Sequence, residues 1–229
     1  MALRSSSEFK DGLNDGRVIY YRGKQVQDVV AHDDLGIGVE HVALDYELAE
    51  NSEYSALYTW HDPELNQPCS RYFKIPDSSE DLLTRRKMIE ESTRLGDAVV
   101  LLIKEIGSDA LFALDLVTNK IDSECNTGYR GNVKAFLQEC KINDLSLAVA
   151  QTDVKGNRSL LPSDQEHADY YVRIVEERPD GIVVRGAKAH TTCAPYVDRI
   201  IVLPTRAFGE NDGSYAVSFA VPVNAPGLK

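Results

Sequence analysis

The chain has 229 residues, of which 43% are hydrophobic, so it can build one large domain or two small ones around a sizeable core. Its formal net charge of -11 at pH 7 repels phosphate backbones and anionic lipid headgroups, which argues against nucleic-acid and membrane-surface roles. The sequence has neither an apolar run of about 18 residues nor the apolar core of a signal peptide near its start. These features predict a cytoplasmic globular protein.

Sequence motifs argue against several kinds of site. No pair of histidines has HxxxH or HExxH spacing, so no metal site is expected. The chain lacks GxGxxG, P-loop and GxSxG patterns, so a dinucleotide would need a fold other than the Rossmann fold. The four cysteines are scattered without CxxC spacing, which predicts reduced thiols: Cys69, Cys125, Cys140 and Cys193.

Helical patterns dominate the first part of the chain. Residues 5–13 predict a short helix, and residues 38–50 carry apolar side chains at helical spacing. Between these two segments, β-forming residues at 17–26 flank Gly23 and predict a hairpin. A further helix is expected at 132–141, where apolar residues again lie on one side.

The strongest helical pattern covers residues 78–106. Pro76 blocks an earlier start, Ser78 is a suitable N-cap, and Gly107 is a natural stop. The second half of this segment is apolar nearly all round, which indicates deep burial. We therefore expect one helix of about 28 residues, roughly 42 Å long at about 1.5 Å per residue.

Beyond residue 144 the pattern changes to β-strands. Pro179, Asp180 and Gly181 form a strong turn signal. Short apolar or alternating runs predict the strands, at 145–150, 171–177, 182–184, 199–203 and 215–221. The sequence thus predicts an α+β protein with a mainly helical domain at residues 1–143 and a β domain at residues 144–229.

Two polar loops in the β half carry the candidate chemistry. The first, residues 151–158, combines hydroxyl, amide and cationic donors with Gly156, where backbone can approach a ligand closely. The second, residues 185–192, places Lys188 and His190 among small residues that let a flat ligand approach. His190 could transfer a proton or donate a hydrogen bond, although a single histidine without a visible partner is more often structural. On residue types alone, an ordinary polar turn is the preferred interpretation of the first loop.

The same loops carry a resemblance to a known family. The stretch DGIVVRGAKAH at residues 180–190, followed by RIIVLPT at 199–205, closely resembles the middle-domain signature of the 4-hydroxyphenylacetate 3-hydroxylase / 4-hydroxybutyryl-CoA dehydratase family. TDVKGNRSLLPS at 152–163, DYELA at 45–49 and YAVSFAVPVNAPGL at 215–228 fit as well. The blocks match in order over nearly all of the chain and are nearest to the dehydratase branch.

The resemblance implies an acyl-CoA-dehydrogenase-like architecture: a helical N-terminal domain, a β-sheet or barrel middle domain, and a C-terminal helical bundle that is missing here. It also implies FAD between the middle domain and the bundle, usually within a tetramer. We therefore expect a homo-oligomer, or a partner chain that supplies the bundle. By resemblance, the FAD contacts would come from Val149, Ala150, Gln151, Lys155, Gly156, Asn157, Arg158 and Thr192.

The chain also departs from the family pattern at two sets of positions. In the dehydratase branch a CxxxC pair ligates a [4Fe-4S] cluster, but the aligned residues here are Leu101 and Glu105, so that cluster is not expected. In the hydroxylase branch an Arg, a Tyr and a His hold the phenol substrate. The aligned residues here are Ile106, Ala110 and Val149, so 4-hydroxyphenylacetate itself is not the expected substrate.

Three hypotheses follow. The first is a two-component FAD-dependent monooxygenase that takes reduced flavin from a separate flavin reductase and hydroxylates an aromatic or related small organic substrate. Its candidate catalytic residue is His190. The second is an acyl-CoA dehydratase- or isomerase-like flavoprotein that lacks the iron–sulfur ligands, and the third is a non-catalytic truncated subunit. The first two require residues 155–158 and 188–192 to form one wall of a flavin site.

Overall fold

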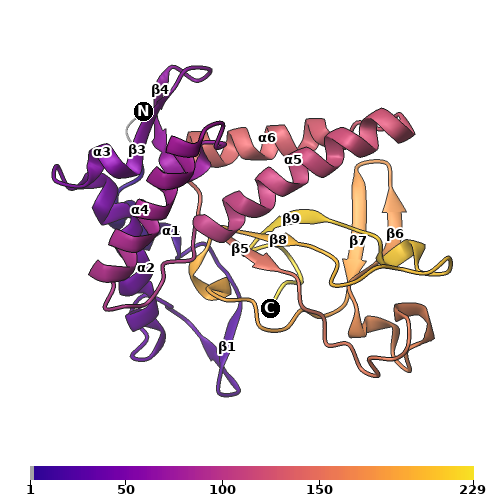
Figure 1. The fold of residues 1–229 in the computed structure, drawn as a ribbon. Coiled ribbons are helices and arrows are strands. Elements are labelled where there is room, and N and C mark those ends of the chain that lie inside the picture. The colour runs from indigo at the N-terminus through magenta and orange to yellow at the C-terminus, as the bar shows by residue number, and fades with distance from the viewer. Residues whose placement is uncertain (1–2) are drawn as a thin grey trace. The chain divides into compact units, whose positions relative to one another are not determined.

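The computed structural model describes residues 3–229, which form two compact units (Figure 1). Unit 1 comprises the described residues up to Ala148 together with Cys193–Arg199 and Pro222–Lys229, and unit 2 comprises Val149–Thr192 and Ile200–Val221. Helices make up much of unit 1, whereas unit 2 is built from strands and short 3-10 turns. The α+β class is therefore confirmed, while the domain boundary between residues 143 and 144 stays a prediction.

Unit 1 contains most of the elements that the first part of the sequence predicts, together with three that it does not. The helices expected at 5–13, 38–50 and 132–141 and the hairpin at 17–26 are confirmed, whereas α3, the second hairpin and α5 were not predicted. None of the described helices is long and apolar enough to cross a membrane. The helices are α1 (Ser6–Gly12), α2 (Leu35–Glu50), α3 (Ser55–Tyr58), α4 (Ser79–Leu95), α5 (Glu105–Cys125) and α6 (Tyr129–Asn143). The antiparallel hairpins pair β1 (Ile19–Tyr21) with β2 (Lys24–Val26) and β3 (Thr59–Asp62) with β4 (Gln67–Ser70).

Helix α1 begins with a reciprocal cap. The Ser5 hydroxyl accepts a hydrogen bond from the Glu8 backbone N–H at 3.1 Å, and the Glu8 carboxylate accepts one from the Ser5 N–H at 2.8 Å. One turn further on, the buried Phe9 ring stacks on Tyr46 of α2 with ring centroids 4.6 Å apart. The cap therefore sets where α1 starts, and the stacked pair holds α1 against α2.

The prediction of a single long helix at residues 78–106 is wrong. The Ser78 side chain caps the Asp81 N–H as expected, but α4 ends at Leu95. Asp97 and Ala98 then adopt positive φ angles of 53° and 65°, a left-handed conformation that cannot continue an α-helix. The apolar stripe thus belongs to two helices and the irregular segment between them.

Helix α5 starts where the long helix was expected to stop. The segment before it buries Leu101 and Ile103, but Val99 and Val100 are 55% and 39% exposed, so the deep burial expected for this part of the chain is present only in part. Gly107, the expected stop, lies in the first turn of α5. Its missing side chain leaves room for Leu147, because a Cβ added at Gly107 would lie 2.2 Å from the Leu147 Cβ.

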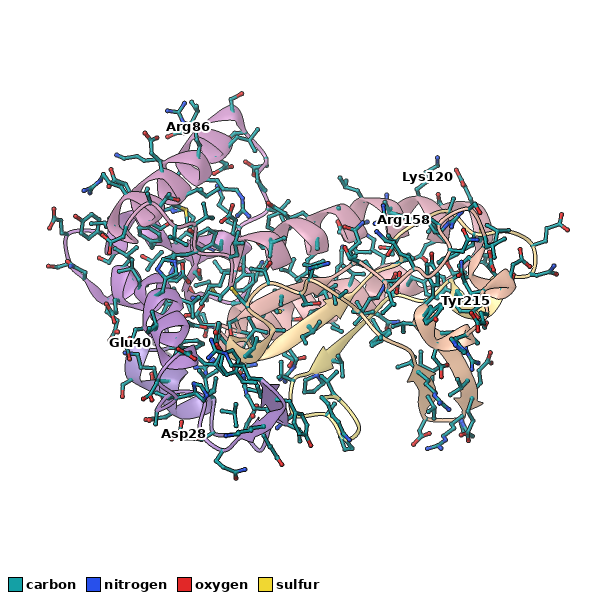
Figure 2. All side chains as sticks on the ribbon, turned by 90° about the horizontal axis from the view of Figure 1, so that it is seen from below. Asp28, Glu40, Arg86, Lys120, Arg158 and Tyr215 are labelled. Carbon is teal, nitrogen blue, oxygen red and sulfur yellow. The ribbon has the colours of Figure 1, made fainter. Side chains whose placement is uncertain are left out.

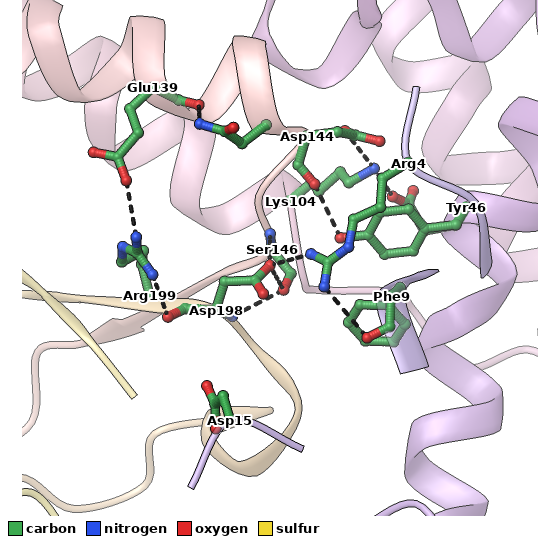
Figure 3. A network of polar contacts seen from close by, with 12 residues as sticks. Arg4, Phe9, Asp15, Tyr46, Lys104, Glu139, Asp144, Ser146, Asp198 and Arg199 are labelled. Carbon is green, nitrogen blue, oxygen red and sulfur yellow. Dashed lines mark hydrogen bonds and ion pairs between the residues drawn. The ribbon is translucent and has the colours of Figure 1, made fainter. Parts of the chain in front are cut away.

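A buried ion cluster joins three helices of unit 1 (Figure 3). The Lys104 Nζ lies 3.0 Å from an Asp45 carboxylate oxygen on α2 and 2.8 Å from an Asp144 oxygen at the end of α6. It also lies 3.8 Å from the centroid of the Tyr46 ring, whose hydroxyl donates to the Asp144 carbonyl at 3.2 Å. Burial alone lowers the pKa of Lys104, but the charges of Asp144 and Asp45 outweigh it and raise the pKa above its ordinary value.

A second polar network in unit 1 centres on Asp198 (Figure 3). One Asp198 carboxylate oxygen accepts hydrogen bonds from the Ser146 N–H at 2.7 Å, the Ser146 hydroxyl at 2.6 Å and Arg4 Nη1 at 2.8 Å. Ser146 directly precedes β5 (Leu147–Ala150), and Asp198 directly precedes β8 (Arg199–Val202). The network therefore fixes the chain at the two points where it runs from unit 1 into unit 2.

The β half contains one small sheet and one hairpin. Strands β5, β8 and β9 (Phe219–Pro222) hydrogen-bond in the order β5-β8-β9. Strand β6 (Arg173–Arg178) pairs antiparallel with β7 (Gly181–Arg185) around the expected turn. The predicted strands are confirmed within a few residues, except that the last begins at Phe219, after a 3-10 turn at Gly213–Tyr215.

Candidate functional site

The two polar loops that the sequence singles out meet within unit 2. The Thr152 carbonyl accepts a hydrogen bond from the Ala189 N–H at 2.8 Å, and Asp153 and Lys188 form an isolated antiparallel bridge. The Lys188 ammonium also pairs with an Asp153 carboxylate oxygen at 2.7 Å. Both loops therefore belong to one structured surface. The direct contact is made by Thr152 and Asp153, just before the predicted 155–158 stretch.

Asp153 is the hub of this contact. It is 3% exposed, and its carboxylate accepts from Lys188, the Val172 N–H and the Thr205 hydroxyl. Lys188 also donates to the carbonyls of Gln151 at 2.9 Å and Leu203 at 2.8 Å. Burial lowers the pKa of Lys188, and Asp153 opposes that effect. Lys188 is thus committed to holding the loops together.

The stretch after Asp153 is held in one shape by its own side chains. The Gln165 side chain accepts from the Asn157 N–H at 3.0 Å and donates to the Asn157 carbonyl at 2.8 Å. The Asn157 side chain in turn accepts from the Ser159 N–H at 3.1 Å. Gly156 has a φ of +53°, and a Cβ there would meet Gln165 and the Tyr170 ring at 2.5 and 2.6 Å. Glycine is therefore required by packing within the loop itself.

Lys155 and Arg158 are the predicted site residues with uncommitted charge. Among residues 3–229, neither has a carboxylate within ion-pairing distance, and the Arg158 side chain is exposed (Figure 2). Lys155 is half-buried and has a φ of 76°, which marks a sharp bend in the backbone. Two cations on a rigid loop, with no internal partner in the described chain, can hold an anionic ligand.

The remaining predicted residues flank this surface. Val149 and Ala150 end strand β5, and Gln151 is exposed just beyond it. His190 is exposed with a φ of 58° and follows Ala189, whose N–H bonds to the first loop. Thr192 is exposed at the end of the same segment of unit 2, so its hydroxyl is free to meet a ligand.

A larger hollow lies elsewhere in the described part of the chain. It measures about 500 Å³ and is lined in unit 1 by the β1–β2 hairpin and the segment that follows, with Tyr21, Arg22, Lys24 and His32 among its lining residues. Around Asp153 and Lys188 the hollow measures only about 10 Å³, room for one water molecule at most. A ligand of the two loops would therefore lie on the surface of unit 2.

The match to known proteins agrees with the resemblance carried by these loops. Residues 5–229 match the family described as 4-hydroxyphenylacetate 3-hydroxylase N terminal. The chain belongs to this family. The family match spans both units and includes every predicted site residue.

Two curated relatives represent the two branches of the hydroxylase family. The chain is 37% identical over 211 residues to the 4-hydroxybutyryl-CoA dehydratase/vinylacetyl-CoA-Delta-isomerase of Clostridium aminobutyricum, with 92% of this chain and 42% of that protein covered. It is 26% identical over 232 residues to the 4-hydroxyphenylacetate 3-monooxygenase oxygenase component of Geobacillus sp. (strain PA-9), with 100% and 46% covered. The chain thus spans less than half the length of these relatives.

Solved structures confirm the acyl-CoA-dehydrogenase-like fold expected from the sequence. An oxygen-tolerant archaeal 4-hydroxybutyryl-CoA dehydratase from N. maritimus superimposes with a TM-score of 0.91 at 30% identity, covering 98% of this chain and 44% of that chain. The oxygenase component of 4-hydroxyphenylacetate 3-monooxygenase complexed with FAD superimposes with a TM-score of 0.83 at 23% identity, covering 98% and 45%.

The positions aligned with the cluster cysteines of the dehydratase branch do not fit an iron–sulfur cluster. Leu101 is 2% exposed in the segment before α5, and Glu105 is half-buried in the first turn of that helix. Burial raises the pKa of the Glu105 carboxyl, an effect that the charge of Arg85 opposes. Neither residue supplies a thiolate, the ligand type that such clusters require.

Proposed function

We propose that this chain is the N-terminal part of a two-component FAD-dependent monooxygenase acting on an aromatic or related small organic substrate. Family membership supports the flavin enzyme class, and relatives with 25–27% identity are named as oxygenase components or as an FADH(2)-dependent monooxygenase. A separate flavin reductase would then supply the reduced cofactor. The remaining helices would come from further chain, from a partner chain or from a homo-oligomer.

One observation carries the cofactor assignment: two loops far apart in sequence form a single surface that presents unpaired cations. The Thr152–Ala189 hydrogen bond and the Asp153–Lys188 ion pair join them at 2.8 and 2.7 Å. Beside this junction the loop bearing Lys155 and Arg158 is already ordered by Gln165. A surface that is ordered before it binds loses little conformational entropy when an anionic cofactor arrives.

The residues at this surface would have different roles in binding and catalysis. Lys155 and Arg158 would hold the negatively charged part of FAD, while Gly156 and Asn157 keep the loop in shape. Thr192 would donate its hydroxyl to the flavin ring edge, and Val149, Ala150 and Gln151 would line the same site. Because Ala150 is 3% exposed, it would do so through its backbone. His190 would accept or donate a proton at its imidazole on the substrate side. When bound, reduced FAD supplies the activation of dioxygen that hydroxylation needs.

Flavin binding tests this proposal directly. We expect FAD to bind the purified chain, and the double variant Lys155→Gln/Arg158→Gln to weaken binding by about 10-fold or more, because two charge-assisted contacts are lost. Isothermal titration calorimetry or quenching of flavin fluorescence gives the affinity. Arg178→Gln is the matched control, because Arg178 pairs with Glu176 at 2.8 Å on the β6–β7 hairpin, away from the loops in sequence. No FAD binding by the unaltered chain would favour the non-catalytic subunit.

A second candidate function is an acyl-CoA dehydratase- or isomerase-like flavoprotein. The 37% identity to the Clostridium aminobutyricum dehydratase and the TM-score of 0.91 to the archaeal dehydratase favour it. Leu101 and Glu105 argue against the cluster-dependent form of that chemistry.

Iron analysis separates the two candidates. We expect protein purified without oxygen to contain no stoichiometric iron or acid-labile sulfide, because Leu101 and Glu105 offer no thiolate. Colorimetric iron and sulfide assays, with FAD content measured in the same sample, give the answer. About four iron atoms per chain would reverse the order of the two functions.

A further inference from the structure

The cations of unit 2 fall into two groups. Four of them have a carboxylate partner: Arg173 and Arg185 pair with Asp169, Arg178 with Glu176, and Lys188 with Asp153, at 2.7 to 3.2 Å. Within residues 3–229, the other three have no carboxylate at ion-pairing distance: Lys155, Arg158 and Arg206. The chain has a net charge of -11, so carboxylates are plentiful. Three cations without an ion-pair partner in one small unit therefore suggest an anionic ligand.

Hydrogen bonds place Arg206 beside the loop that carries Lys155 and Arg158. Its Nη1 donates to the Leu160 carbonyl at 2.8 Å, at the end of the loop that begins with Lys155. The hydroxyl of the preceding residue, Thr205, lies within hydrogen-bonding distance of both the Gln151 carbonyl and the Asp153 carboxylate, at the start of that loop. The chain at 205–206 thus lies along the loop and brings the Arg206 guanidinium to it.

Asp212 is the nearest acidic influence on Arg206, but the two form no ion pair. Burial opposes the shift, yet hydrogen bonds from Gly209 and Ser163, together with the charge of Arg206, lower the pKa of Asp212. Its two carboxylate oxygens accept backbone N–H bonds from Ser163 and Gly209, each at 2.8 Å, and the side chain is fully buried. Arg206 itself is half-buried, and its single hydrogen bond to Leu160 leaves most of its five N–H donors available. The guanidinium of Arg206 is therefore held in place by Leu160, while most of its N–H donors have no partner in the described chain.

We propose that Arg206 is a further cofactor-binding residue, which acts with Lys155 and Arg158 to bind the diphosphate group of FAD. This inference rests on the proposed function and deepens it. A guanidinium presents parallel N–H donors that match phosphate oxygens, and a diphosphate brings the charge to engage more than one cation. The three cations would then favour FAD over FMN, which has one phosphate and no diphosphate.

Three ligands test the inference in one set of titrations: FAD, FMN and ADP. For Arg206→Gln we expect the affinities for FAD and ADP to fall about 10-fold or more, because a charge-assisted contact to the diphosphate is lost. The affinity for FMN should stay within about 2-fold, since FMN does not reach the same contact. Arg206→Lys keeps the charge without the planar fork, so it should recover part of the FAD affinity.

The outcomes distinguish this inference from the proposed function. If the unaltered chain binds FAD and Arg206→Gln binds it equally well, or loses FMN as strongly as FAD, Arg206 is not a diphosphate ligand and the flavin assignment still stands. If the unaltered chain binds none of the three ligands, both proposals are wrong. Arg178→Gln serves again as the control. Thermal melting of each variant shows whether it is folded, and Arg206→Lys provides the test should Arg206→Gln fail to fold.

Discussion

Replacing Lys104 with methionine is expected to lower the free energy of unfolding by about 3–5 kcal/mol. The ammonium group is 1% exposed, and it is the shared counter-charge of Asp45 and Asp144, both 3% exposed. Methionine has a similar length and fills most of the space, so packing is largely kept. The two carboxylates would then face each other in a buried site without a cation, and each would lose the attraction that offset its burial.

The pH dependence of this effect has a defined sign. Lys104 has a pKa above its ordinary value in the folded chain, so its stabilising contribution is fully present below about pH 10.4 and is lost only at higher pH. Burial raises the pKa of Asp45 despite the nearby Lys104. Loss of Lys104 should raise the pKa of Asp45 further. The difference in unfolding free energy between the variant and the unaltered chain should therefore be largest near neutral pH, and it should shrink as the pH falls and Asp45 takes up a proton.

Urea denaturation of the variant and of two companions measures the effect. Lys120→Met is the matched control, because Lys120 is 75% exposed on α5 and makes only a loose contact with Glu124 at 3.9 Å (Figure 2). We expect that control to change stability by less than about 0.5 kcal/mol. Adding Asp45→Asn to Lys104→Met should restore part of the loss, because one buried charge is removed. A loss below about 1 kcal/mol for Lys104→Met would show that the cluster is not a charge-balanced unit.

Elements set by local interactions could be predicted from the sequence. The caps at Ser5 and Ser78 act within three residues along the chain, and the β1–β2 turn around Gly23 needs only its own backbone. The α4–α5 break could not be predicted, because it depends on two successive residues, Asp97 and Ala98, adopting a left-handed conformation that alanine disfavours. Tertiary packing must offset the conformational free energy that this backbone geometry costs.

The candidate site was predictable only in part, for the same reason. The loops at 151–158 and 185–192 were recognisable from residue types and from the family blocks. The ion pair of Lys188 with Asp153 joins residues far apart in sequence, so Lys188 resembled a ligand-binding cation until the structure showed its partner. Arg206 was overlooked because its link to Leu160 spans 46 residues. A cationic residue just after the RIIVLPT block was the available signal.

Gly107→Ala is expected to lower the free energy of unfolding by about 1–3 kcal/mol, although alanine is the better helix former. The added Cβ would lie 2.2 Å from the Leu147 Cβ and 2.7 Å from its Cδ1. A rotamer change of Leu147 cannot move its Cβ, so the start of α5 must shift from β5. Both residues lie in unit 1, where the Leu147 N–H also donates to the Ile103 carbonyl, and such a shift would disturb that bond.

Gly131→Ala, on the neighbouring helix α6, is expected to raise the free energy of unfolding rather than lower it. Gly131 lies in α6, and a Cβ there would meet nothing within 4 Å, so alanine should stabilise the chain by up to about 1 kcal/mol through the lower entropy of its unfolded state. The two variants carry the same chemical change in the same kind of element, so their difference in urea denaturation isolates the contact with Leu147. If Gly107→Ala were as stable as Gly131→Ala, α5 and β5 would have to be farther apart than the structure places them.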